Sequence, residues 1–208
     1  ENAGKFNNDY TEVILVAEKQ AEYIPDIKVE NEIWTYGYGK AGEDFKPFTK
    51  KGDYSSGSPV QRRDNGNKWW SAAQNTSDKS WTDQAHSITF PPKSIGAIAL
   101  HPGPNTHNYS KVRYTAPANG KYTIHLKFKH LDAQFSEAKA EIWTNADGKW
   151  SELDEVSLTK IAYDNNNGVL EKVFQLTLNK GEIISVDIEA AGSYANDYTQ
   201  VIFGVDKK

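Results

Sequence analysis

The chain has 208 residues, of which 38% are hydrophobic and 25% charged, so it can bury a core and is not a disordered tail. Its net charge of −4 argues against a nucleic-acid-binding protein, which normally carries a basic face, and no apolar run approaches the roughly 20 residues of a membrane span. The absence of cysteine excludes disulfides, thiol catalysis and Cys-ligated metals.

The two ends of the chain share a repeated unit. Residues 6–14 (Phe-Asn-Asn-Asp-Tyr-Thr-Glu-Val-Ile) reappear after 188 residues as residues 194–202, with six of nine positions identical. Such recurrence is typical of an array of similar domains. We therefore interpret residues 1–27 as the tail of a preceding repeat, or an extra edge strand, plus a linker, and residues 28–208 as one β-sandwich domain. The alternative is that both ends are edge strands of a single domain. The lack of methionine, even at position 1, predicts a processed or excised piece of a longer protein.

Aromatic residues alternate in the first predicted strand, residues 34–38 (Trp-Thr-Tyr-Gly-Tyr), where the glycine permits close backbone packing. The segment from 37 to 87 is rich in Gly, Ser, Asn, Lys and Trp and has little periodicity, so it is expected to form long loops. It contains Trp69, Trp70 and Trp81. Each of these indoles either anchors a loop to the sandwich or faces outward to recognise a ligand.

Alternation of apolar and polar residues predicts four strands in the second half of the chain. Their apolar positions are Tyr122, Ile124, Leu126 and Phe128; Leu170, Phe174, Leu176 and Leu178; Ile184, Val186 and Ile188; and Val201, Phe203 and Val205. Turns containing Asn and Gly separate the strands, and no amphipathic helix is recognisable. This pattern predicts an all-β fold, an antiparallel two-sheet β-sandwich of the jelly-roll type with long loops.

A further strand places an indole on a polar face. Trp143 shares its parity with Lys139 and Glu141. If residues 145–148 form a four-residue turn, Trp143 faces Trp150 across the hairpin and the two indoles form a flat surface. Sugar rings bind such surfaces, because their C–H faces are apolar while their hydroxyls stay hydrated. The alternative is a cross-strand pair that only covers the sheet.

No motif for catalysis stands out. His101 and His107 flank a Pro-Gly loop, but no third zinc ligand follows at a telling spacing, so ordinary surface or turn histidines are expected. Asp197, in the repeated Asn-Asp-Tyr-Thr unit, either forms an Asx-type turn or helps to hold a structural calcium ion, and no other cofactor is expected. Carboxylates from distant strands could still form a hydrolase or lyase site, but nothing in the sequence points to one.

Four stretches together resemble a known class of domain: residues 34–37 (Trp-Thr-Tyr-Gly), 100–103 (Leu-His-Pro-Gly), 112–124 (Val-Arg-Tyr-Thr-Ala-Pro-Ala-Asn-Gly-Lys-Tyr-Thr-Ile) and 196–199 (Asn-Asp-Tyr-Thr). They are similar to bacterial extracellular β-sandwich domains related to galactose-binding-like jelly rolls and carbohydrate-binding modules. The resemblance implies a domain that recurs in large secreted or cell-surface proteins, often beside glycan-degrading modules. It supplies no binding residues, so the assignment of the hairpin tryptophans rests on strand parity alone.

Together these observations predict a non-catalytic carbohydrate-binding domain of a secreted multi-domain bacterial protein, which holds a polysaccharide by aromatic stacking. The expected binding residues are Trp143, Trp150, Trp69, Trp70 and Trp81. The expected partners are a glycan and neighbouring domains of the same parent chain, with no nucleic acid and no membrane span. Two alternatives remain: a structural spacer or adhesion module in which the aromatic residues only pack, and a fragment of a polysaccharide hydrolase or lyase.

Overall fold

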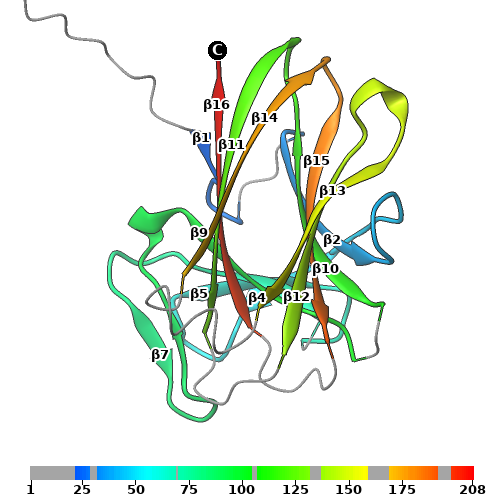
Figure 1. Ribbon diagram of the computed structural model, residues 1–208. Coiled ribbons are helices and arrows are strands. Elements are labelled where there is room, and N and C mark those ends of the chain that lie inside the picture. The colour runs from blue at the N-terminus through cyan, green and yellow to red at the C-terminus, as the bar shows by residue number, and fades with distance from the viewer. Residues whose placement is uncertain are drawn as a thin grey trace, which may run out of the picture.

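The computed structural model describes residues 22–28, 32–68, 70–104, 107–131, 137–158, 169–191 and 198–208. Two antiparallel β-sheets pack against each other as a sandwich (Figure 1). This arrangement confirms the all-β, two-sheet fold expected from the sequence. Among the residues just given, no helix is long and apolar enough to cross a membrane.

The larger sheet has eight strands. Their order is β14 (Leu170–Leu178), β11 (Gly120–His130), β16 (Thr199–Lys207), β9 (Ala97–His101), β6 (Ser71–Asn75), β5 (Val60–Asp64) and β4 (Lys50–Asp53), and β1 (Glu22–Tyr23) also pairs with β16. The six-stranded sheet has the order β13 (Ser151–Leu158), β12 (Ala138–Thr144), β15 (Ile183–Ala190), β10 (Tyr109–Thr115), β2 (Trp34–Gly39) and β3 (Lys46–Pro47). A separate hairpin pairs β7 (Trp81–Asp83) with β8 (Ile88–Phe90), and there are two short 3₁₀ turns, η1 (Lys93–Ile95) and η2 (Ala146–Gly148). From β9 to β16 the chain crosses between the large sheets at nearly every step, as in a jelly roll.

The alternation seen in the sequence positions the main core between the two large sheets. In β11 the apolar residues are buried, whereas Lys127 and Lys129 on the opposite parity are exposed. In β15 and β16 the apolar residues also share one parity and lie in the main core, for example Val186 and Phe203, but the opposite parity of β15 is buried as well. Full burial of each such side chain contributes about 1.5–3 kcal/mol, so the inward face fixes the register of every long strand.

The segment from 37 to 87 is not a set of long loops, and that expectation was wrong. It contains β3, β4, β5, β6 and β7, which extend both large sheets and begin the separate hairpin. These strands are two to five residues long, too short to show a clear period. In addition, β6 (Ser-Ala-Ala-Gln-Asn) is buried on both faces, so it lacks the alternation of a half-buried strand.

The outer face of the eight-stranded sheet carries a second hydrophobic cluster. Its buried members are Val60, Ala73, Ile88, Phe90, Ala99 and Tyr198. The β7–β8 hairpin supplies two of these side chains and thereby covers part of the face. Neighbouring residues of β6 therefore serve different cores: Ala72 belongs to the main core, and Ala73 to the second cluster.

The segment that precedes β2 packs onto the sandwich. Ile24 and Ile27 are buried in the main core, and β1 pairs with β16. The side-chain amide of Gln74 holds the segment, because its oxygen accepts a hydrogen bond from the Ile27 amide at 2.7 Å and its nitrogen donates to the Pro25 carbonyl at 3.3 Å. The first copy of the repeated unit, residues 6–14, lies outside the described residues.

Candidate functional site

The outer face of the six-stranded sheet carries a dense set of polar residues. Side chains alternate along a strand, so the residues opposite in parity to the core face outward from β10, β12 and β15. They are Tyr109, Lys111, Arg113, Lys139, Glu141, Trp143, Ser185, Asp187 and Glu189. Charges at such positions are ordinarily solvated, yet Lys111 and Asp187 are 0% exposed. The face is therefore covered.

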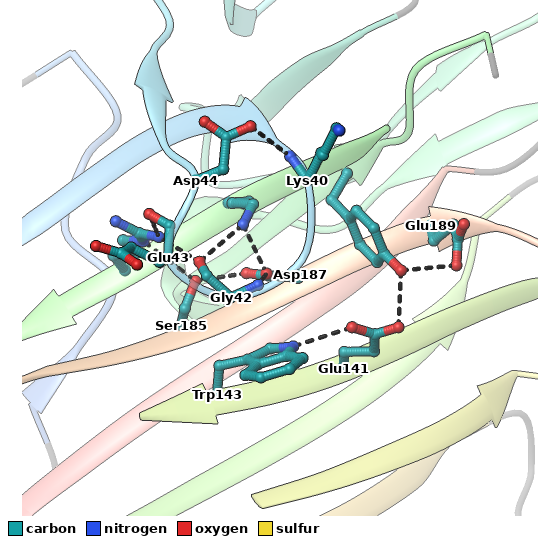
Figure 2. A network of polar contacts seen from close by, with 12 residues as sticks. Lys40, Gly42, Glu43, Asp44, Glu141, Trp143, Ser185, Asp187 and Glu189 are labelled. Carbon is teal, nitrogen blue, oxygen red and sulfur yellow. Dashed lines mark hydrogen bonds and ion pairs between the residues drawn. The ribbon is translucent and has the colours of Figure 1, made fainter. Parts of the chain in front are cut away.

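The β2–β3 loop provides this cover (Figure 2). The carbonyl of Gly42 accepts a hydrogen bond from Lys111 Nζ at 3.0 Å, and its amide donates to Asp187 Oδ2 at 3.0 Å. Lys111 Nζ also lies 2.8 Å from the same carboxylate oxygen, and Ser185 Oγ donates to Asp187 Oδ1 at 2.5 Å. Burial lowers the pKa of Lys111 and raises the pKa of Asp187, while their mutual attraction opposes both effects. One buried ion pair thus holds the loop to the sheet.

Arg113 lies beside this pair, between two aromatic rings. Its guanidinium carbon is 4.3 Å from the ring centroid of Phe45 and 4.7 Å from that of Trp150. Both distances are within the range of cation–π contacts. Its Nη2 donates to the carbonyls of Gly42 at 2.6 Å and Glu43 at 3.0 Å. Arg113 therefore ties the β2–β3 loop and the β12–β13 connection to β10.

Carboxylates gather around Tyr109 and Lys139 on the remainder of the face. The Tyr109 hydroxyl lies 2.7 Å from Glu141 Oε1 and 2.9 Å from Glu189 Oε2, within hydrogen-bonding distance of both (Figure 2). Lys139 Nζ lies 2.7 Å from a Glu141 oxygen and 3.2 Å from a Glu189 oxygen. It also lies 3.2 Å from Glu155 Oε2 on β13. Three carboxylates thus share one ammonium group.

The protonation states of this cluster follow from its contacts. Burial by itself would raise the pKa of Glu141, but hydrogen bonds from Lys139 and neighbouring donors outweigh it and hold that pKa below its ordinary value. Burial opposes the charge on Lys139, yet the surrounding carboxylates raise its pKa. Burial and the two adjacent carboxylates raise the pKa of Tyr109. At neutral pH the cluster therefore combines an ionised Glu141, a cationic Lys139 and a neutral phenol.

Trp143 and Trp150 both lie at this face, but they do not oppose each other as expected. In the β12–β13 pairing Trp143 is opposite Glu152, and Thr144 is opposite Ser151, with a register shift just before Trp143. The expected pairing of the two indoles across a four-residue turn is wrong, because the connection from β12 to β13 is longer.

The reason for the longer connection is an anchor at Asn145. Its amide donates to the Ile183 carbonyl at 3.1 Å, and its side-chain oxygen accepts from the Ile183 amide at 2.5 Å. These bonds continue the pairing with β15 past the end of β12, and η2 follows before the chain turns back. Consequently Trp150 precedes β13 and reaches Arg113 instead of Trp143.

Each of these indoles is covered on one side and half-buried overall. The Trp143 indole N–H donates to Glu141 Oε2 at 3.0 Å (Figure 2). Its ring packs against Gly42, where a Cβ atom would lie only 3.1 Å from the ring. Trp150 is covered by the Arg113 guanidinium. The two indoles are thereby fixed by the same loop and charges, and each keeps part of its surface open to solvent.

Trp70 and Trp81 pack against other aromatic rings. The Trp70 indole donates to the Tyr109 carbonyl at 3.1 Å, and its ring centroid is 4.5 Å from that of Tyr38. Trp81 lies 6.1 Å from Phe90 in the second cluster. These contacts fit the first of the two roles that the sequence left open for them, anchoring to the sandwich, and their part in glycan binding stays a prediction.

Trp69 and Asp197 lie outside the described residues, so their roles in glycan binding and calcium binding stay predictions. His101 is buried, and His107 is exposed with Nδ1 3.2 Å from Glu189 Oε1. Within the part of the chain that the structure describes, no group of three or more His, Asp or Glu side chains is arranged to hold a metal ion.

Sequence reasoning missed Lys111, Arg113 and Asp187. Alternation in β10 and β15 assigns them to an outer face, where charged residues are common and do not by themselves indicate a site. One signal was available in the sequence. Two adjacent outward positions of β10 carry cations, Lys111 and Arg113, and an outward position of the neighbouring strand β15 carries a carboxylate, Asp187. Their burial depends on the course of the β2–β3 loop, which no local pattern reveals.

No family model and no curated protein matches this sequence. Solved structures similar to it include a family 35 carbohydrate-binding module from Clostridium thermocellum, 13% identical with a TM-score of 0.35, covering 53% of this chain and 78% of that one. The CBM22-1 xylan-binding domain from Paenibacillus barcinonensis is 10% identical with a TM-score of 0.38, covering 81% and 97%. Murine APRIL is 11% identical with a TM-score of 0.27, covering 82% and 98%. TM-scores this low establish neither a family nor a function.

Proposed function

We propose that this domain is a non-catalytic carbohydrate-binding module whose glycan lies on the outer face of the six-stranded sheet, beside Trp143 and Trp150. The observation that carries the proposal is the placement of two half-buried indoles, each with part of its surface open, next to fixed hydrogen-bonding groups. An indole surface suits the apolar C–H face of a sugar ring, and the exposed Glu155 at the edge of the cluster offers an acceptor to hydroxyl groups.

The cost of the buried charges supports a role beyond stability. Replacing a buried ion pair by well-packed apolar residues is often neutral or stabilising by about 1–4 kcal/mol. The Lys111–Asp187 pair fixes Gly42, and Gly42 is the surface on which Trp143 rests. The charges therefore hold an indole in a defined orientation, which lowers the entropy lost when a ligand stacks on it.

A single site of this kind is weak. Each stacked ring contributes about 1 kcal/mol beyond its buried area. One small site of this kind is expected to have a dissociation constant between about micromolar and millimolar, a binding free energy of about −8 to −4 kcal/mol. Several copies in one secreted or surface-attached protein would raise retention through effective concentration. The repeat of residues 6–14 at residues 194–202 supports that multi-domain setting.

Affinity electrophoresis against a panel of cell-wall and plant polysaccharides tests the proposal. Trp143→Ala and Trp150→Ala are expected to reduce retention by about fivefold or more each, the loss of roughly 1 kcal/mol of stacking. Trp143→Phe keeps an aromatic face, so this variant is expected to migrate with most of the wild-type retention. Trp81→Phe is the control, because Trp81 packs in the second cluster. Unchanged migration of both alanine variants, with folding verified by their melting temperatures, would exclude this face.

A spacer or adhesion module is the second candidate, and the one-sided covering of both indoles favours it. The two readings differ in how the tryptophan fluorescence responds to ligand. A bound polysaccharide should protect the open sides of Trp143 and Trp150 from quenching by acrylamide, whereas a spacer gives the same quenching with and without polysaccharide. Turnover of a polysaccharide by the isolated chain would favour a hydrolase or lyase instead.

A further inference from the structure

The open side of the Trp143 indole lies toward the edge of the six-stranded sheet. Trp143 is opposite Ser185 of β15 on one side and opposite Glu152 of β13, the outermost strand, on the other. The β2–β3 loop covers the β15 side, where Gly42 contacts the Trp143 ring and donates a hydrogen bond to Asp187. Glu152 is exposed, and directly opposite residues on one face have Cβ atoms about 4.5–5.5 Å apart. A ligand that stacks on the open part of the Trp143 indole therefore meets Glu152.

The carboxyl group of Glu152 is not engaged by another group of the protein. Across the residues that the structure describes, no hydrogen bond or ion pair joins it to a neighbour, whereas Glu141 and Glu155 are both paired with Lys139. Burial and the charges of Glu141 and Glu155 raise the pKa of Glu152, and Lys139 opposes this rise without cancelling it. Negative potential therefore remains beside Trp143 after the charge of Lys139 has been counted.

The wider charge balance of this face has the same sign. The cluster beside Trp143 contains Lys139 as its cation and four glutamates, which are Glu141, Glu152, Glu155 and Glu189. His107 Nδ1 lies 3.2 Å from Glu189 Oε1, so this imidazole adds at most one positive charge. The Asp154 carboxylate on β13 is balanced by Lys172, whose Nζ lies 2.8 Å away.

The remaining charges of the face, its covering loop and the β12–β13 connection do not reverse this sign. The cations are Lys40, Lys111, Arg113 and Lys149, and the carboxylates are Glu43, Asp44, Asp147, Glu182 and Asp187. Carboxylates therefore outnumber cations both in the cluster and over the whole face.

This charge distribution discriminates between classes of glycan. A uronate or sulfate group beside Trp143 would lie next to the Glu152 carboxylate and be repelled. A protonated amine would be attracted both by that carboxylate and by the π-face of the indole, the side-chain ring that binds cations best. Each contact is exposed to solvent, so each is expected to raise affinity by about two- to fivefold.

We infer that the glycan on this face carries free amino groups, as a polymer of glucosamine does, and that Glu152 binds the amine next to the ring stacked on Trp143. This ligand class rests on the proposed function, because it concerns the same site. The indoles define where the glycan lies, and the carboxylates decide which sugars are accepted. Because the cationic Arg113 covers Trp150, the amine belongs at the Trp143 end of the ligand.

The test is an NMR titration of the full chain with oligomers of glucosamine, N-acetylglucosamine and galacturonic acid, matched in length. Mildly acidic pH keeps the amines charged, and low ionic strength limits screening. Wild-type protein is expected to bind the glucosamine oligomer about fivefold or more tightly than the N-acetylglucosamine oligomer, with galacturonic acid weakest. Added sodium chloride should reduce this preference.

Glu152→Gln should lower the affinity for the glucosamine oligomer by about two- to fivefold and leave the affinity for the N-acetylglucosamine oligomer unchanged. Glu171→Gln is the matched control. It removes the same charge from β14 of the eight-stranded sheet, where Glu171 Oε1 lies 2.8 Å from Lys127 Nζ. Both affinities of this control should stay at the wild-type values.

Three results would overturn the assignment of an amino sugar while leaving glycan binding at Trp143 intact. One is a wild-type protein that binds the glucosamine oligomer no more tightly than the N-acetylglucosamine oligomer. Another is an equal loss of glucosamine affinity in Glu171→Gln and Glu152→Gln, because overall charge would then explain the preference. The third is no binding of any oligomer by a protein that still retains another polysaccharide through Trp143. If Trp143→Ala changes neither oligomer binding nor polysaccharide retention, the proposed function fails and the amino-sugar assignment fails with it.

Discussion

Glu141 shows how one carboxyl group couples the outer face of the six-stranded sheet to pH. It is nearly buried, and it accepts hydrogen bonds from Tyr109 and the Trp143 indole while Lys139 Nζ lies 2.7 Å away. Its pKa in the folded protein is below its ordinary value, because these donors outweigh burial. The ionised carboxyl therefore stabilises the fold at pH values above its unfolded pKa, and this contribution is lost as the pH falls through the carboxyl range.

We expect Glu141→Gln to lose about 1–3 kcal/mol of unfolding free energy at pH 7, the cost of weakening hydrogen bonds to a charged group. The difference in unfolding free energy between wild type and this variant should narrow as the pH falls below the ordinary glutamate range and through the lowered pKa of Glu141, because the wild-type carboxyl becomes protonated there. Urea unfolding at several pH values measures both effects. Glu152→Gln is the matched control: burial and the nearby Glu141 and Glu155 raise the pKa of Glu152, so its neutralisation should not cost stability at pH 7. A difference in unfolding free energy between Glu141→Gln and wild type that does not change with pH would contradict this account.

At the scale of an element, the β2–β3 connection shows how one glycine positions the polar face. A Cβ atom on Gly37 would overlap the Lys46 carbonyl oxygen and lie 2.6 Å from the Phe45 ring. Such contacts cannot be accommodated without moving β3 away from β2. Because Phe45 also stacks on Arg113, this movement would disturb the cover of the buried charges.

Gly37→Ala is therefore expected to lower the unfolding free energy by about 1–3 kcal/mol through overpacking. Gly52→Ala is the control, since Gly52 also lies in an edge region but has no atom within 4 Å of its Cβ position. That change should stay within about 0.5 kcal/mol of wild type. Calorimetric melting of both variants measures the two changes in unfolding free energy. If both variants lose the same amount of unfolding free energy, close packing at Gly37 is not the cause.

The individual strands show which parts of the fold could be predicted from the sequence and which could not. Long strands whose apolar residues share one parity, such as β11 and β15, alternate clearly in sequence and were predicted with their inward residues. The short strands from β3 to β7 escaped, because two to five residues carry little periodicity and β6 is buried on both sides. At the candidate site, parity placed Trp143 on the outer face correctly. The position of Trp150 depended on a tertiary bond between Asn145 and Ile183, which local turn chemistry does not disclose.

At the scale of the whole molecule, the sandwich contains two hydrophobic clusters that share strands but face opposite ways. The main core lies between the large sheets, and the second cluster lies under the β7–β8 hairpin on the outer face of the eight-stranded sheet. The polar face with Trp143 lies on the far side of the main core from that hairpin. A substitution that destabilises the second cluster should therefore leave the polar face ordered.

Phe90 tests this separation. It is 1% exposed and its ring centroid lies 5.1 Å from that of Tyr54 and 5.7 Å from that of Tyr198. Phe90→Ala should cost about 3–5 kcal/mol, the loss for removing a buried phenylalanine. Hydrogen exchange should accelerate most in β7, β8 and the strand ends beneath them, because local opening requires only the contacts of that cluster. The amides of β12 and β15 should keep their relative protection.

Val173→Ala, at a position 59% exposed on β14, is the control and should change nothing measurable. A uniform rise in exchange over both sheets would instead mean that the two clusters unfold as one cooperative unit, so that damage beneath the hairpin also loosens the face on which Trp143 is held.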